Sequence, residues 1–156
     1  MVRVLRSTIL TAPVEAVWEV LRDFNGHDRW HPAVATSQVE RGRASDEVGC
    51  VRRFRLADGS ELREQLLTLS DLEQSFSYCL LDTPVPLFNY VAHMGPNPVT
   101  DGDRTFWEWG RAGSILPPGG RPNSAGWSAR TSTSPGSMPS GRIWGWKDSP
   151  CLRSRP

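Results

Sequence analysis

The segment "DFNGHDRWHP" holds the densest group of side chains that could do chemistry. His27 and His31 are four residues apart and Asp23 precedes His27 by four, so one continuous helix would bring all three to one face, as in some metal sites. The Asn25-Gly26 turn breaks that face, and no further well-spaced ligand of the HExxH kind is present. We therefore predict no metal site, with His31 capping a turn before Pro32 and His27 in solvent.

Acid–base chemistry needs a titrating group held beside a substrate. Glu64 and His31 are the candidate catalytic residues, and Tyr78, Tyr90 and His93 are the other titrating side chains that we consider. In "ELREQLL" Glu64 alternates in step with two leucines, which would turn it to the inner face of a sheet, paired with Arg53 or Arg55 of the facing strand. The alternative, which we favour, is a cross-strand ion pair on the solvent face.

The remaining composition excludes several classes of function. The sequence has no GxSxG nucleophile motif and no phosphate-binding glycine loop after a strand, so we predict no cofactor. A net charge of +1 gives no reason to expect nucleic acid as a partner. Three scattered cysteines and the lack of a long apolar segment predict a cytoplasmic protein with reduced thiols and no membrane insertion.

The spacing of apolar residues near the start of the sequence predicts one strand followed by one helix. Residues 2–11 alternate as a half-buried strand does. Val14, Val17, Trp18 and Leu21 then form the apolar stripe of a helix, with Thr11 or Ala12 as its cap and Pro13 in its first turn. We expect Asn25-Gly26 to end this helix, because glycine accepts a left-handed conformation, and a second short helix to follow.

A meander of six strands follows these helices. Val51 and Phe54, or their neighbours, should face inward, and Asp58-Gly59 should form a hairpin turn. The strands are expected at 34–40, 50–56, 61–70, 75–82, 88–99 and 104–110.

The inner face of such a sheet offers an apolar pocket with a few polar groups to orient a ligand. We expect Trp30 to pack inward. The predicted ligand-binding residues are Trp18, Phe24, Trp30, Arg53, Phe54, Glu64, Leu66, Tyr78, Tyr90, His93 and Trp107.

The order of these elements resembles a known family. At "TAPVEAVWEVLRDFNGHDRWHPAV", "VGCVRRFRLADGSELREQLL", "FSYCLLDTPVPLFNYVAHM" and "VTDGDRTFWEWG" the sequence is similar to the SRPBCC superfamily, in its polyketide cyclase/dehydrase and lipid-transport-like branch. The resemblance implies an α+β helix-grip fold, in which a curved antiparallel sheet holds an N-terminal helix pair and a long C-terminal helix. Members include ligand carriers, hormone receptors and polyketide aromatases, so the resemblance does not choose a function.

The resemblance ends near residue 110, so we divide the chain into an incomplete ligand-binding domain, 1–110, and a tail, 111–156. Half of the tail is Gly, Pro or Ser, and it is basic where the domain is acidic, which predicts disorder and no C-terminal helix. If the gene were read in a frame that starts at the third base of each present codon, the codons of four tail residues would encode apolar side chains at helical spacing. These residues are Ser124, Trp127, Ser128 and Ser132. We hypothesise a frameshift near residue 111.

Three functions are compatible with this sequence. The first is binding of a small hydrophobic molecule, such as a lipid, isoprenoid or aromatic polyketide. The second is an enzyme of the cyclase or dehydratase type that uses polar pocket residues for proton transfer. The third is a truncated product without activity.

Overall fold

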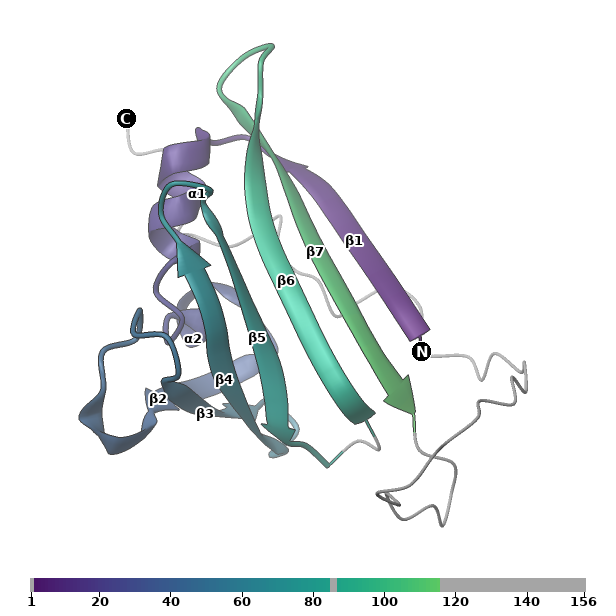
Figure 1. Ribbon diagram of the computed structural model, residues 1–156. Helices are drawn as coiled ribbons and strands as arrows, with labels where there is room; N and C mark the ends of the chain where they lie inside the picture. Colours follow the sequence, from purple (N-terminus) through teal and green to yellow (C-terminus); the bar gives the residue numbers. More distant parts are fainter. Residues whose placement is uncertain (1, 85–86, 116–156) are drawn as a thin grey trace.

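A computed structural model describes residues 2–84 and 87–115 of the 156-residue chain. Seven strands form one antiparallel sheet in the order β1-β7-β6-β5-β4-β3-β2, and two helices pack against one of its faces (Figure 1). The helices are α1 (Val14–Leu21) and α2 (His27–Trp30), with a 3₁₀ turn, η1 (Glu40–Gly42). The strands are β1 (Val2–Leu10), β2 (Val34–Val39), β3 (Val51–Leu56), β4 (Glu61–Ser70), β5 (Ser75–Asp82), β6 (Leu87–Val99) and β7 (Arg104–Ile115).

The sheet curves strongly between its two ends. Figure 1 shows β2 and β3 running across the direction of β6, β7 and β1. Breaks in register in β2, within the β4–β5 pair and in β6 accompany this curvature, since a bulge bends a strand and increases its twist. The α+β helix-grip fold expected from the sequence is therefore confirmed.

Helix α1 buries the four residues of its predicted apolar stripe, Val14, Val17, Trp18 and Leu21. Its ends differ from the prediction. Pro13 is the cap residue rather than part of the first turn, and the helix stops at Leu21, before Asn25-Gly26. Gly26 has φ −72°, so it caps α2 in an ordinary conformation and its predicted left-handed role was wrong.

The core lies between the helices and the inner face of the sheet. Strand alternation decides which residues reach it, because successive side chains point to opposite faces. In β3 the inward residues are Arg52 and Phe54, whereas Val51 is only half-buried and belongs to the other parity. The core residues of the strands are Leu10, Leu66, Phe76, Tyr78, Tyr90, Ala92, Met94 and Trp107, and Cys50, just before β3, joins them.

The last strand is longer than predicted. Strand β7 pairs with β1 and β6 as far as residues 113–115, so it extends five residues beyond the expected end at 110. The predicted disordered or frameshifted tail falls almost wholly on residues 116–156, which lie outside the described residues, and it stays a prediction.

Candidate functional site

Arg52 and Glu64 form a buried ion pair at the centre of the inner face. They lie directly opposite one another on β3 and β4. Arg52 donates from Nε and Nη2 to the same oxygen, Glu64 Oε2, at 2.9 and 2.6 Å. The two side chains are only 3% and 6% exposed. Glu64 therefore faces inward, so the favoured solvent-face interpretation was wrong, and its partner is Arg52 rather than Arg53 or Arg55.

Aromatic rings enclose the guanidinium of Arg52. Its central carbon lies 3.9 Å from the ring centre of Phe24, 5.3 Å from that of Tyr78 and 5.4 Å from that of Phe54. Arg52 also donates through Nη1 to the backbone carbonyl of Phe24. Stacking and hydrogen bonding to these groups compensate for taking a cation out of water. This end of the inner face is consequently filled by the protein's own side chains.

Two buried tyrosines, Tyr78 and Tyr90, add hydroxyl groups to the inner face. The ring centres of Tyr78 and Tyr90 are 6.4 Å apart, and Arg111 lies close enough to lower the pKa of Tyr90. Burial raises the pKa of Tyr78 well above its ordinary value, and the negative charge of Glu64 adds to the effect. Burial likewise raises the pKa of Tyr90. Both tyrosines are therefore neutral at pH 7 and can donate hydrogen bonds.

Burial also raises the pKa of Glu64, and the Arg52 cation opposes that shift. A carboxyl group in such surroundings is a possible site of proton transfer, because its neutral and charged forms are closer in free energy than in water.

The two histidines of α2 lie at the edge of this cluster. His27 is buried, contrary to the prediction that it lies in solvent, and its ring contacts those of Trp30, His31 and Phe54. Its Nδ1 atom is buried, and no described residue forms a hydrogen bond with it. His31 Nδ1 accepts a hydrogen bond from the Ala33 N–H at 3.3 Å, which is the turn-capping role expected of it.

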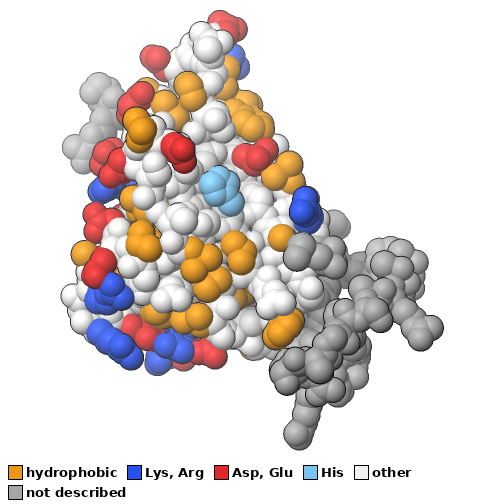
Figure 2. Space-filling view, viewed as in Figure 1, with side chains coloured by type: hydrophobic (Ala, Val, Ile, Leu, Met, Phe, Trp, Pro, Cys, Tyr) orange, Lys and Arg blue, Asp and Glu red, His pale blue; other side chains and the backbone are white. Residues whose placement is uncertain are grey.

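Two predicted ligand-binding residues, Arg53 and His93, lie on the outer face of the sheet rather than on the inner face. Arg53 lies on the outer face, where it is 58% exposed and is 3.5 Å from Glu40. His93 is exposed on β6 because its neighbours Ala92 and Met94 take the inward positions. The outer face, over the sheet in the view of Figure 2, carries apolar side chains scattered among polar ones.

The other predicted ligand-binding residues are buried on the core side. Trp18 lies under the β4–β5 turn, where its Nε1 donates to Asp71 at 2.9 Å. Those brought together around the inner face are Phe24, Trp30, Phe54, Glu64, Leu66, Tyr78, Tyr90 and Trp107. Sequence reasoning missed Arg52 and Arg111. An inward Phe54 would have indicated Arg52, because residues two apart on a strand share a face.

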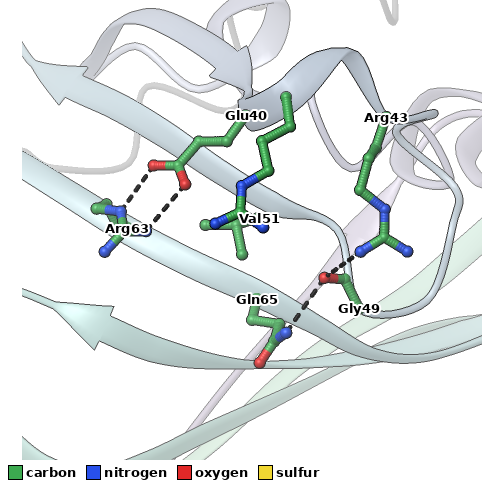
Figure 3. Close-up of a pocket in the computed structure, with 7 residues that line it drawn as sticks. Glu40, Arg43, Gly49, Val51, Arg63 and Gln65 are labelled. Carbon is green, nitrogen blue, oxygen red and sulfur yellow. Dashed lines mark hydrogen bonds and ion pairs between the residues drawn. The ribbon is translucent and has the colours of Figure 1, made fainter.

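Two pockets formed by described residues lie away from the inner face. One, of about 280 Å³, lies beside β3 and β4 (Figure 3). Two of its three arginines bind neighbouring groups: Arg63 donates to Glu40 through Nε and Nη2 at 2.7 and 2.9 Å, and Arg43 donates to the carbonyl of Gly49. The other, of about 320 Å³, lies between the start of α1 and the β6–β7 turn. Neither contains a predicted ligand-binding residue.

Within 2–84 and 87–115, no three His, Cys, Asp or Glu side chains gather as a metal site requires. No helix in that part of the chain is long and apolar enough to cross a bilayer.

Solved structures similar to this fold include several bacterial proteins. A protein from Nitrosospira multiformis is 29% identical, with 73% of this chain and 79% of that chain covered and a TM-score of 0.64. A protein from Thermobifida fusca is 28% identical, with 76% and 77% covered and a TM-score of 0.66. The Zhui aromatase/cyclase from Streptomyces sp. R1128 is 17% identical, with 74% and 69% covered and a TM-score of 0.63, a likeness of fold alone.

A search of curated proteins found no match. A family model described as "Polyketide cyclase / dehydrase and lipid transport" matches residues 1–132, which include every strand and helix of the structure. The curved seven-stranded sheet, the helix pair and this match agree, and the chain belongs to the polyketide cyclase/dehydrase and lipid transport family of the SRPBCC superfamily.

Proposed function

We propose that this protein binds a small hydrophobic molecule, such as a lipid, isoprenoid or aromatic polyketide, on the inner face of its sheet. The observation that carries the proposal is the apolar lining that continues from the filled end near Phe24 to Trp107 at the other end. Partly buried Leu80, Leu87 and Trp109 extend this lining. Ligand sites in proteins are mostly apolar, with a few placed polar groups, and this face has that composition.

The half of the inner face formed by β6, β7 and β1 is the better place for the ligand. Around Arg52 the rings of Phe24, Phe54 and Tyr78 leave the ion pair enclosed. Towards β7 and β1, the inward residues Trp109 and Val4 are only half-buried. A ligand placed there would remove apolar surface from water, at about 25 cal/mol per Å².

Thermal shift and tryptophan fluorescence test this proposal. We expect at least one of palmitic acid, farnesol and 2-naphthol to raise the Tm of the full chain and to change its fluorescence. Trp109→Leu should weaken that binding, and Phe106→Leu, on the outer face of the same strand, should not. No response to any of the three ligands, or equal loss in the two variants, would contradict the proposal.

The second candidate function is catalysis of the cyclase or dehydratase type, for which Glu64 gives the specific support. It is buried, its pKa is raised, and it lies beside neutral tyrosines. In this candidate reaction, the ionised carboxylate takes a proton from the carbon next to a carbonyl of a bound polyketide, and the resulting enolate oxygen accepts a hydrogen bond from a tyrosine.

Turnover of an aromatic polyketide precursor separates the two candidates. Loss of turnover in a folded Glu64→Gln variant, with turnover kept in His31→Ala, would assign the proton transfer to Glu64. Absence of turnover on any polyketide substrate, with ligand binding intact, would leave binding as the function.

A further inference from the structure

Arg111 is a half-buried cation on the inner face of β7. It lies opposite Ala92 of β6, whose side chain points into the core. Its guanidinium carbon is 5.0 Å from the ring centre of Trp109, two residues earlier on the same face. The contact with Trp109 and the partial burial of Arg111 place its charged group beside the apolar lining rather than in open solvent.

The charge of Arg111 is not balanced by a carboxylate among the described residues. Within 2–84 and 87–115, no ion pair to Arg111 is formed, in contrast to Arg22, Arg52 and Arg63. Glu64, the buried carboxylate on this face, accepts from Arg52 instead. A cation partly removed from water is most stable with an anion nearby, so this position favours a negatively charged group.

Tyr90 supplies a hydroxyl group close to Arg111. It is buried on the same inner face, its Cα and Cβ atoms lie beside Gly113, two residues after Arg111 on β7, and Arg111 lowers its pKa. A hydroxyl has two acceptor positions and one donor position. The neutral Tyr90 hydroxyl can therefore donate one hydrogen bond to an acceptor that also binds the guanidinium N–H groups of Arg111.

We propose that Arg111 and Tyr90 together bind the carboxylate of an amphipathic ligand whose apolar body lies against Trp107 and Trp109. This inference rests on the proposed binding function and adds the chemical class of the ligand. A guanidinium presents paired N–H donors that match the two oxygens of a carboxylate, and the Tyr90 hydroxyl supplies another donor. An ester or an alcohol of the same shape lacks the charge that this pair recognises.

Fluorescence titration with cis-parinaric acid and its methyl ester tests the proposal in the full chain. We expect the unaltered protein to bind the acid at least about tenfold more tightly than the ester, as a charge-assisted hydrogen bond would give. Arg111→Gln should remove this preference by weakening binding of the acid alone. Tyr90→Phe should reduce the preference by a smaller factor, since the ring remains.

Arg3→Gln is the matched control. Arg3 lies on the neighbouring strand opposite Ala112, and its exposed side chain faces outward, so the substitution removes the same charge from the other side of the sheet. The acid preference should be unchanged in this variant. If Arg111→Gln does not fold by circular dichroism, Arg111→Lys, which keeps the charge but loses the paired donors, should lower the preference at least threefold.

The outcomes separate this inference from the proposed function. Equal affinity for acid and ester, or an acid preference that survives in Tyr90→Phe and in whichever Arg111 variant folds, would overturn the carboxylate site and leave hydrophobic binding intact. Failure of both probes, together with the panel described above, would overturn the binding function itself.

Discussion

Arg52 and Glu64 lie opposite one another on β3 and β4, and both hydrogen bonds between them converge on the single oxygen Oε2 of Glu64. Arg52 also donates to the carbonyl of Phe24, in the turn between the two helices. One side chain therefore connects the sheet to the helix pair. A buried pair of this kind adds little stability compared with apolar residues of the same size, but losing one member leaves an uncompensated charge.

Loss of either partner should destabilise the fold strongly. We expect Arg52→Met and Glu64→Leu each to lower the free energy of unfolding by about 3–5 kcal/mol, because each leaves the other charge buried and unpaired. The double variant should be more stable than either single variant. Urea unfolding of the three proteins measures this coupling.

Arg53→Met provides the matched control for Arg52→Met. Arg53 is adjacent in sequence and largely exposed, so its loss should change the free energy of unfolding by less than about 1 kcal/mol. Equal destabilisation by the two substitutions, or simple additivity in the Arg52–Glu64 double variant, would contradict the assignment of Arg52 to the core.

The sequence was sufficient to predict the strand order along the chain and the apolar stripe of α1, because periodicity is a local property. The pairing of Glu64 was not predicted correctly. "CVRRFRL" contains three arginines, and a shift of one residue turns Arg53 inward in place of Arg52. Register depends on contacts between strands, and these are set by bulges and by the long-range pairing that a single sequence does not display.

The predicted positions of His93 and His27 were wrong for related reasons. Only the alternation of inward and outward residues along β6 could place His93. The sequence did not settle that alternation, because the strand contains Gly95, Pro96 and Pro98. His27 was assigned to solvent because it is polar, whereas it is buried between Phe54 of β3 and Trp30 of its own helix. Polarity of a residue type predicts exposure less well where aromatic neighbours surround it.

Stability should fall in mild acid because of His27. Burial, the Arg52 cation and His31 hold the pKa of His27 well below its ordinary value of 6.5. Below about pH 6.5 the unfolded chain takes up a proton that folded His27 does not, so the free energy of unfolding decreases by up to about 1.4 kcal/mol per pH unit. Burial also lowers the pKa of His31, which contributes in the same direction.

Urea unfolding between pH 7.5 and 5 measures this dependence. His27→Leu should reduce the slope, and at pH 7.5 it should cost little, since it removes a buried Nδ1 with which no described residue forms a hydrogen bond. His93→Leu, at an exposed position, should keep the slope of the unaltered protein. An unchanged slope in His27→Leu would show that folded His27 takes up its proton as readily as the unfolded chain.

Asp71 should fasten α1 to the β4–β5 turn. Its Oδ1 accepts from Trp18 Nε1 and from Arg22 Nε, both at 2.9 Å, and its Oδ2 accepts from Arg22 Nη2 at 3.0 Å. Because the carboxylate is 58% exposed, we expect Asp71→Ala to lower the free energy of unfolding much less than loss of Arg52 or Glu64 does. Asp71→Asn should cost less, since its amide oxygen still accepts from Trp18. Asp103→Ala, in another exposed turn, is the control, and an equal effect of Asp71→Ala and Asp103→Ala in urea unfolding would contradict this role.

Gly59 should be needed for its backbone conformation alone. It has φ +87° in the β3–β4 hairpin, where the Leu56 N–H donates to the carbonyl of Ser60 at 2.8 Å. A Cβ atom at Gly59 would meet nothing within 4 Å, so steric crowding by neighbours is excluded. We expect Gly59→Ala to lower the free energy of unfolding by about 1 kcal/mol and Gly59→Asn by less, because asparagine tolerates positive φ better than alanine. If thermal unfolding ranks the two variants in the opposite order, a cause other than backbone conformation must account for the glycine.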